Sequence, residues 1–316
     1  MRVLVTGATG FVGQHFCQAL VNRGHDVVAA MRQQGSRSPT DGVTPVIVGD
    51  IGPETSWRPA LSGIDAVVHL AARAHVMRDT AEDPEAAYRR INVEATRRLA
   101  EEAVAADVQR FVFLSSVKVN GEQTTDAAYR PDDTPSPEGA YGRTKRDAET
   151  ALIIAAEGSK TETVILRSPL VYGPGMKGNA LTLFRAVARG LPLPLGSIDN
   201  RRSMVFAGNL ADALMSSLEK PAAAGGVFFV SDDDDVSTAT FARRAAAALG
   251  RPARLLPIPV GLLKLIGRVG GKSAVIERVV GSLQIDISDF QKKLNWTPPF
   301  TMKEGLEQTA SWYKSR

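Results

Sequence analysis

The chain has 316 residues and a net charge of +4, and 44% of its residues are hydrophobic and 23% charged. These values are ordinary for a globular protein and exclude disordered, fibrous and disulfide-rich classes. Cys17 is the single cysteine, so no intramolecular disulfide can form. A nucleic-acid binder typically gathers its arginines on one element, whereas here they are spread along the chain. We expect a buried thiol at Cys17, no nucleic-acid partner and small anionic ligands.

Short apolar runs of strand length alternate with helical patterns through the first half of the chain. The runs "RVLVT", "DVVAAM", "PVIVGD", "DAVVHLAA", "RFVFLSS" and "ETVILRS" predict strands, and the helical patterns lie at 11–22, near Trp57, and at 83–106, 140–156 and 179–189. Nearly continuous apolar strands between helices indicate an α/β fold, with a doubly wound parallel sheet covered by helices on both faces.

The pattern changes after "RSPLVYGPG". Proline and glycine interrupt "RGLPLPLGSIDNRRS", and a strand-like "GGVFFVSD" and a helical "TATFARRAAAALG" follow. We therefore expect residues 1–170 to form the first domain. Residues 171–316 are expected to form mainly a smaller substrate-binding region, with some segments returning to the first domain.

Three glycines follow the first strand and open the first helix in "VLVTGATGFVGQHF". Glycines there permit a tight turn, let the backbone approach a pyrophosphate and allow the helix to pack closely on the sheet, while the helix N-terminus favours negative charge. The pattern predicts a Rossmann dinucleotide-binding loop. The residues expected to contact the cofactor are Gly7, Thr9, Gly10, Phe11, Val12 and Gly13. Their G-x-x-G-x-x-G spacing resembles that of the short-chain dehydrogenase/reductase superfamily.

The end of the second strand indicates which dinucleotide is bound. NAD sites place an acidic residue there for the ribose hydroxyls, but this chain has Met31 and Arg32. Arg32 or Arg37 could hold a 2′-phosphate through two hydrogen bonds, and a solvated surface arginine is the alternative. NADP(H) is therefore favoured, and NAD(H) stays possible.

The superfamily resemblance implies further cofactor contacts, near the adenine after the third strand and along the "HLAA" segment that runs past the cofactor. The matching residues are Asp50, Ile51, Leu70, Ala71 and Ala72. Asn92 matches a family position that supports the central sheet.

Tyr141 and Lys145 lie four residues apart in the helical "AYGRTKRDAE", which places both side chains on one helix face. A tyrosine with a pKa near ~10 is a poor acid-base group until a nearby cation favours its ionised form. Ser116 ends the preceding strand, at the edge where ligands bind in open α/β sheets. Together the three resemble the superfamily's catalytic triad. That resemblance implies that Ser116 binds a substrate carbonyl, Tyr141 transfers the proton, and Lys145 holds the nicotinamide ribose and lowers the tyrosine pKa.

Nearly the whole chain resembles the extended short-chain dehydrogenases of the epimerase/dehydratase family, which process nucleotide sugars. The glycine loop, "HLAA", the triad, "LRSPLVYGPG" and "NRRSMVFAGNLADAL" carry this resemblance. It implies that Asn179 and Arg202 hold the diphosphate of a UDP-sugar, that the backbone around Leu195 in "LPLPLG" lines the uracil, and that Arg278 is a second phosphate ligand.

The segment after the serine, "SSVKVNG", bears on the reaction type. It has no carboxylate before Glu122, whereas related sugar dehydratases have an Asp-Glu pair there, so dehydration is disfavoured. The chain most resembles bacterial reductases of UDP-4-keto-6-deoxy-N-acetylhexosamines, which form UDP-N-acetylquinovosamine or its 4-epimer for surface polysaccharide. A UDP-hexose 4-epimerase with tightly bound NAD is the alternative, and a non-catalytic dinucleotide sensor is a more remote one. Lys118 either reaches the sugar or turns to solvent.

The later segments predict no further cofactor. "DDDD" at 232–235 precedes a helix, which explains its charge better than a metal does, and no metal site is expected. The apolar "LLPIPVGLLKLIGRVGG" is interrupted by Pro257, Pro259 and Lys264, so it predicts an amphipathic or packed helix and no membrane span. The N-terminal run has no secretion-signal pattern. We expect a cytoplasmic protein with no membrane partner. The resemblance to related folds implies a homodimer, paired through helices near 92–105 and 141–157.

Overall fold

The structure, a computed structural model, describes residues 1–33, 40–74 and 82–316. Its centre is a parallel seven-stranded sheet in the order β3-β2-β1-β4-β5-β6-β9. The strands are β1 (Arg2–Thr6), β2 (Asp26–Met31), β3 (Val43–Ile47), β4 (Ala66–His69), β5 (Arg110–Ser116), β6 (Glu162–Ser168) and β9 (Val227–Phe229). The predicted α/β class with a doubly wound parallel sheet is confirmed.

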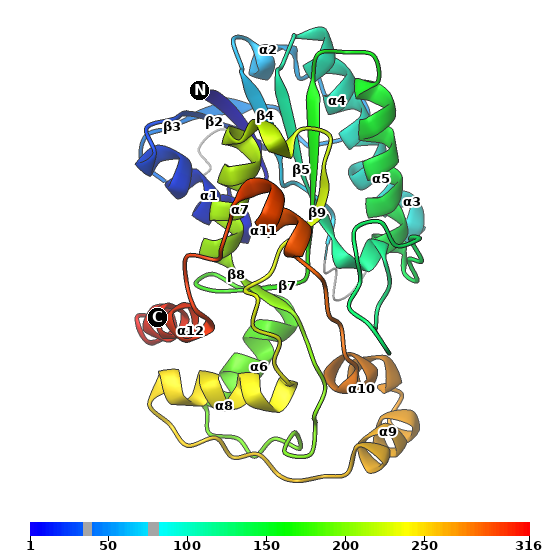
Figure 1. The fold of residues 1–316 in the computed structure, drawn as a ribbon, viewed down its shortest axis with the longest axis vertical. Helices are drawn as coiled ribbons and strands as arrows, with labels where there is room; N and C mark the ends of the chain where they lie inside the picture. Colours follow the sequence, from blue (N-terminus) through cyan, green and yellow to red (C-terminus); the bar gives the residue numbers. More distant parts are fainter. Residues whose placement is uncertain (34–39, 75–81) are drawn as a thin grey trace.

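Helices cover both faces of this sheet (Figure 1). One face packs on α1 (Phe11–Asn22), α7 (Ala207–Glu219) and α11 (Ser288–Leu294), and the other on α2 (Arg58–Leu61), α4 (Ala95–Ala105) and α5 (Ala140–Ala156). Successive strand residues supply the two cores in turn, since Val3 and Val5 face the first and Leu4 faces the second. Burial on both faces is why the strands read as continuous apolar runs.

The helix expected at 83–106 is divided. It consists of α3 (Pro84–Arg89), a π-helical turn at Arg90–Glu94, and α4. Asn92 lies in this turn, is buried, accepts a hydrogen bond from the Arg73 N–H at 2.8 Å and donates one to the Thr144 hydroxyl at 3.1 Å. π-Turns often occur beside functional sites, and this one ties the end of β4 to α5.

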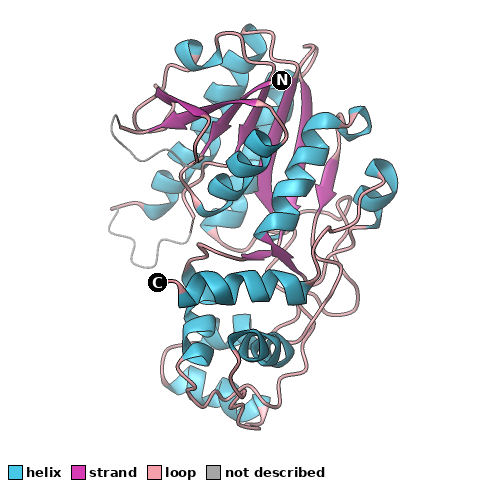
Figure 2. Ribbon diagram, turned by 90° about the vertical axis from the view of Figure 1, so that its left-hand side faces the viewer, coloured by secondary structure: helices cyan, strands magenta, loops and turns pink. Residues whose placement is uncertain are grey.

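The second half of the chain builds a separate core below the sheet, as Figure 2 shows. Its elements are β7 (Leu170–Tyr172), α6 (Gly178–Ala188), β8 (Met204–Phe206), α8 (Thr238–Leu249), α9 (Val260–Val269), α10 (Ser273–Val280) and α12 (Met302–Lys314). The short strands β7 and β8 pair in parallel, and aromatic side chains such as Tyr172, Phe206 and Phe241 fill the centre. Because α7, β9 and α11 pack with the main sheet, this half of the chain contributes to the core on the first face of the sheet as well as to its own core.

Across the part of the chain that the structure describes, no helix combines the length and the apolar character needed to cross a bilayer. Cys17 is buried in α1, as expected.

Candidate active site

Parallel strands end at a common edge of the sheet, and the expected cofactor and catalytic residues gather there. The glycine turn follows β1, the Leu70–Ala72 segment follows β4, and Ser116 closes β5. The first turn of α5 brings Tyr141 to the same edge. The topology therefore brings together segments that are far apart in the sequence.

The β1–α1 turn has little room for side chains. Gly7 has φ of +69°, and a Cβ there would lie 2.8 Å from the Ala71 nitrogen, while a Cβ on Gly13 would lie 2.1 Å from the Gly7 oxygen. Helix α1 has no acidic residue in its first turn, and its N-cap, Gly10, offers no side-chain acceptor. The first N–H groups of a helix lack intrahelical partners, so this turn presents free donors that fit the phosphates of a dinucleotide.

The end of β2 carries Arg32, whose Nε lies 2.7 Å from a carboxylate oxygen of Asp50. Both side chains are largely exposed, so solvent screening leaves the pair worth at most ~1 kcal/mol. A phosphate could therefore compete with Asp50 for the guanidinium. Arg37, the other expected 2′-phosphate ligand, lies outside the described residues.

Tyr141 is partly buried and hydrogen-bonded to Ser116. Burial raises the pKa of Tyr141 to about 12, while the hydrogen bond with Ser116 acts in the opposite direction and the nearby Tyr88 adds to the rise. The sequence analysis predicted a lowered pKa. The direction is reversed because desolvation of the phenolate outweighs the other influences on it.

Lys145 is 2% exposed and lies beneath the tyrosine on α5. Its ammonium donates to the Leu114 carbonyl at 2.7 Å and lies 3.8 Å from the centre of the Phe113 ring. Burial lowers the pKa of Lys145 to about 7, and the Glu149 carboxylate partly offsets this. The lysine is therefore close to its titration point at neutral pH, which weakens the cationic effect that the sequence analysis assigned to it.

A buried ion pair behind the lysine was missed by the sequence analysis. Glu149, one turn after Lys145, accepts from Arg167 of β6 at 2.7 and 3.0 Å and from the Ser115 hydroxyl. Arg167 also donates to the Asn120 side chain at 3.0 Å. The available signal was an arginine inside the apolar run "ETVILRS", because a buried strand rarely carries an unpaired charge.

Lys118, which was expected either to reach the sugar or to turn to solvent, lies just beyond the end of strand β5. Strand β5 ends at Ser116, a 3-10 turn follows at Val117–Val119, and the Lys118 ammonium binds the Glu122 carboxylate at 2.8 and 2.9 Å. The Ser116 hydroxyl accepts from the Lys118 N–H at 3.3 Å. The lysine is thus neutralised locally instead of simply facing solvent.

The expected substrate residues lie in the second half of the chain. Arg202 donates from one nitrogen to the carbonyls of Arg278 and Gly281, both at 2.9 Å. Burial lowers the pKa of Arg202, and Glu122 opposes this, so the arginine lies close to the Lys118–Glu122 pair. The structure brings Arg202 and the Arg278 backbone together. Asn179 is exposed in the first turn of α6, and Leu195 is buried in the lower core.

The four aspartates at 232–235 have separate tertiary partners. Asp232 accepts from the Tyr172 hydroxyl at 2.7 Å and from the Asn209 side chain at 2.7 Å, and burial raises its pKa to about 6. Asp234 pairs with Arg244, and Asp235 accepts from Ser203 at 2.6 Å. The expected helix-terminus explanation is therefore incomplete, since these carboxylates join elements of the fold. No group of metal-binding side chains occurs among the described residues.

Comparisons with known proteins agree with this architecture. The pattern of the NAD dependent epimerase/dehydratase family matches residues 3–230. A UDP-glucose 4-epimerase of Vibrio cholerae is 43% identical over 311 residues, which cover 98% of this chain and 94% of that protein. An Escherichia coli O157:H7 protein named N-acetyl-alpha-D-glucosaminyl-diphospho-ditrans,octacis-undecaprenol 4-epimerase is 26% identical, over 98% of this chain and 95% of its own length.

Solved structures show the same fold. MoeE5 in complex with UDP-glucuronic acid and NAD matches with a TM-score of 0.78 and 28% identity, covering 100% of this chain and 99% of MoeE5. MoeE5 in complex with UDP-glucose and NAD matches with a TM-score of 0.77 and 29% identity, with the same coverage of both chains. The chain therefore belongs to the NAD dependent epimerase/dehydratase family of enzymes.

Proposed function

We propose that the protein is an NAD(P)H-dependent reductase of the 4-keto group of a UDP-4-keto-6-deoxy-N-acetylhexosamine. The observation that carries the choice of reductase is the end of β2, where Met31 and Arg32 stand in place of an acid. An arginine there favours a phosphorylated, exchangeable NADPH, and a reductase must exchange its cofactor at each turnover. The UDP-sugar complexes of MoeE5 support the substrate class.

The chain's own residues divide the work in this proposal. Backbone donors of the β1–α1 turn hold the pyrophosphate, with Thr9, Phe11 and Val12 around it and Arg32 at the 2′-phosphate. Asp50 and Ile51 would contact the adenine, and Leu70, Ala71 and Ala72 would contact the cofactor along the segment after β4. The bound nicotinamide supplies a hydride to the sugar C4.

The catalytic roles follow from the hydrogen bonds at the sheet edge. Ser116 and Tyr141 hydrogen-bond the 4-keto oxygen, and Tyr141 donates its proton as negative charge develops there. Its raised pKa keeps that proton in place at neutral pH. Lys145 in its charged form holds the nicotinamide ribose and supports the tyrosine.

The substrate diphosphate is assigned to Arg202, with Asn179 and Arg278 as further ligands and the backbone at Leu195 against the uracil. The carboxylate nearest to Ser116 in the sequence, Glu122, already binds Lys118. This pairing supports reduction over dehydration, because water loss requires a free acid-base carboxylate beside the substrate.

UDP-hexose 4-epimerase is the second candidate, and the Vibrio cholerae relative at 43% identity favours it. The deciding experiment supplies a UDP-4-keto-6-deoxy-N-acetylhexosamine with NADPH in one reaction. A second reaction contains UDP-galactose or UDP-N-acetylglucosamine without added cofactor. We expect loss of nicotinamide absorbance in the first and no sugar interconversion in the second. Interconversion in the second alone would establish the epimerase.

The cofactor assignment has its own measurement, the ratio of kcat/KM with NADPH to that with NADH. We expect a ratio above one in the wild type and a lower ratio in Arg32→Ala, because the variant loses the contact to the 2′-phosphate. Arg58→Ala, on the exposed surface of α2, is the matched control. A preference for NADH in the wild type would show that Arg32 has been misassigned.

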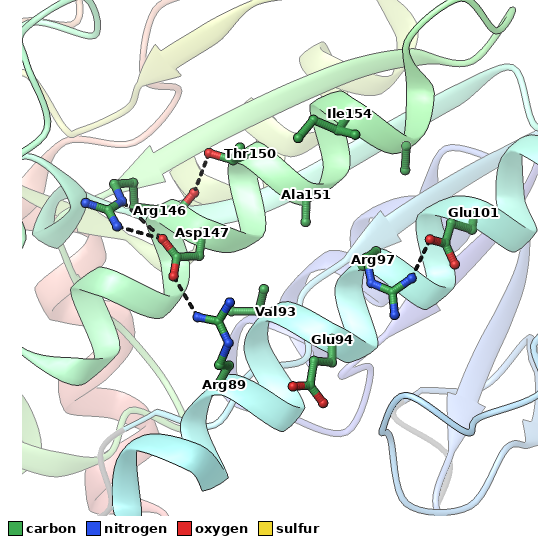
Figure 3. Close-up of a pocket in the computed structure, with 11 residues that line it drawn as sticks. Arg89, Val93, Glu94, Arg97, Glu101, Arg146, Asp147, Thr150, Ala151 and Ile154 are labelled. Atoms are coloured by element: carbon green, nitrogen blue, oxygen red, sulfur yellow. Dashed lines mark hydrogen bonds and ion pairs between the residues drawn. The ribbon is translucent and has the colours of Figure 1, made fainter.

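We also propose a homodimer formed through α4 and α5. A hollow of about 610 Å³ lies on the outer side of these helices. It is edged by the Arg89–Asp147 and Arg97–Glu101 ion pairs, which Figure 3 shows. Ile154 lines this hollow, and it and the neighbouring Ile153 of α5 are both exposed. Neighbouring exposed apolar side chains are typical of a surface that meets another protein.

A further inference from the structure

Helices α9 and α10 form a hairpin at the end of the molecule opposite the N-terminal ends of the sheet strands (Figure 1). The two helices pack closely at Gly267, where an added Cβ would lie only 2.6 Å from the Ile276 side chain. Leu263 is buried on the same side of α9 and joins the lower core. The inner side of α9 is therefore fully packed within this chain.

The outer side of α9 carries a second apolar stripe. Leu262, Leu265, Ile266 and Val269 follow the spacing i, i+3, i+4, i+7 and are 46%, 55%, 57% and 83% exposed. At 100° per residue the centre of this stripe lies about 130° around the helix from that of Leu263 and Gly267. Leu256 before this helix and Val275 after it in the chain are also exposed, so six of the eleven exposed large apolar side chains among the described residues lie within 256–275.

The same segment holds the chain's excess of positive charge. Residues 251–280 contain six basic residues and one acidic residue, Glu277, a net charge of +5. The whole chain has +4, so the remainder has a net charge of −1. The basic residues are Arg251, Arg254, Lys264, Arg268, Lys272 and Arg278. Basic residues occur along the whole chain, but residues 251–280 alone have a larger net positive charge than the chain as a whole.

Much of this charge is available to a partner. Lys264 lies 3.2 Å from Glu277, but neither Arg268 nor Lys272 forms a salt bridge with any residue that the structure describes. Arg268 lies on α9 itself, and Lys272 lies in the turn that leads to α10. Free cations therefore flank the exposed apolar stripe.

We propose that the α9–α10 hairpin docks on an anionic lipid bilayer. Helix α9 lies in the plane of the interface, with Leu262, Leu265, Ile266 and Val269 inserted among the acyl chains and the basic residues against the headgroups. This combination of an apolar stripe and neighbouring cations is what an interfacial helix requires. A second copy of this chain is a poorer partner, because a two-fold contact through this surface would place +5 against +5.

The docking departs from the expectation that the protein has no membrane partner, which rested on the lack of a spanning segment. A surface-bound helix needs no such span. The hairpin also supplies the Arg278 carbonyl that binds Arg202. Docking would therefore hold this part of the candidate substrate region at the membrane surface, whichever reaction the enzyme catalyses.

The test is co-sedimentation of the full chain with vesicles. We expect the wild type to bind vesicles that contain phosphatidylglycerol, to bind those of pure phosphatidylcholine much more weakly, and to dissociate as salt is raised. Leu265→Gln with Val269→Gln should lower the partition coefficient about tenfold or more because less apolar surface is inserted. Arg268→Gln with Lys272→Gln should lower it about tenfold on anionic vesicles only.

Matched controls lie at the other end of the molecule. Ile47→Gln on β3 removes an exposed apolar side chain outside the hairpin, and Arg58→Gln with Lys160→Gln removes two exposed charges. Both controls should bind as the wild type does. All variants should keep the wild-type melting temperature, because every substituted side chain is exposed.

Three results would overturn the proposal. The first is that the wild type does not bind anionic vesicles, and the second is that the Leu265→Gln and Val269→Gln variant binds as fully as the wild type. The third is that this variant changes its oligomeric mass while the wild type does not bind vesicles. The last would make the stripe a contact between copies of the chain. Sedimentation needs no turnover, so its outcome is separate from that of the proposed reaction.

Discussion

Tyr141 and Lys145 lie four residues apart at the start of α5, and burial shifts their pKa values in opposite directions. The tyrosine is raised to about 12 and the lysine is lowered to about 7. Burial disfavours the charged form of each group, which is the anion of tyrosine and the cation of lysine. Near neutral pH, the group that changes its charge is therefore the lysine.

This predicts the pH dependence of the reduction. Lys145 is protonated below about pH 7 and loses its charge as the pH rises through that value. Since we assign its charged form to the reaction, kcat/KM should fall about tenfold per pH unit above this point. Lys145→Arg, whose side chain stays charged, should lack this fall even if its absolute rate is low. A profile for the wild type that is flat from about pH 6 to about pH 9 would contradict the assignment.

Tyr141→Phe tests the proton donor. The variant loses the transferable proton and the hydrogen bond with Ser116 but keeps the ring, so kcat should fall by roughly 10²- to 10⁴-fold. Cofactor affinity, measured by nicotinamide fluorescence, should stay within a few-fold of that of the wild type. Tyr88→Phe is the control, because its ring lies 6.4 Å from that of Tyr141 and it has no assigned role in proton transfer. Retained turnover in Tyr141→Phe would remove the tyrosine from the mechanism.

At the scale of elements, the β1–α1 turn depends on backbone contact with the end of β4. Gly7→Ala introduces both left-handed strain and a Cβ 2.8 Å from the Ala71 nitrogen. Gly24→Ala has similar strain at φ of +77° but nothing within 4 Å of its Cβ. Urea unfolding should show a loss of ~1 kcal/mol for Gly24→Ala and a larger loss for Gly7→Ala, which alone should also weaken cofactor binding. Equal effects of the two substitutions would show that the close approach has no cost.

The Glu149–Arg167 pair joins α5 to β6 and lies behind Lys145. Glu149→Gln leaves the buried Arg167 without its counter-charge, so the free energy of unfolding should fall by ~3 kcal/mol. Because Glu149 raises the pKa of Lys145, the variant should also begin its loss of kcat/KM at a lower pH. Glu157→Gln, exposed at the end of the same helix, should change neither. An unshifted pH profile in Glu149→Gln would limit the pair to a structural role.

At the scale of the whole molecule, the proposed dimer predicts the effect of a charge on the outer face of α5. Ile154 is 64% exposed, and Ile154→Asp would place a carboxylate in the interface between subunits. Light scattering should give twice the monomer mass for the wild type and a monomer for the variant, whereas Ile47→Asp on β3 should stay dimeric. A monomeric wild type would refute the interface.

How far the sequence could lead depends on the range of each interaction. The helix at 11–22 and the start of α5 were predicted from local periodicity, and the Tyr141–Lys145 relation needs only helical spacing. Ser116 could be placed near them because parallel strands share one edge. The Glu149–Arg167 pair and the contact of Arg202 with Arg278 join segments that no local pattern links. The division of 83–106 depends on Asn92 binding Arg73 and Thr144, which is also a tertiary event.

The sequence by itself determined the α/β class, the parallel sheet, the cofactor loop and the identity of the proposed catalytic residues. The class, the sheet and the loop follow from residue periodicity and glycine placement, which are local. The catalytic residues follow from helical spacing and strand-end position together with the resemblance to the superfamily's triad. Only the tertiary structure decided that Lys118 binds Glu122, that burial raises the Tyr141 pKa, and that the apolar stripe of α9 is left exposed by the residues that the structure describes. Burial and charge pairing depend on what lies opposite a side chain, and only the folded chain supplies that.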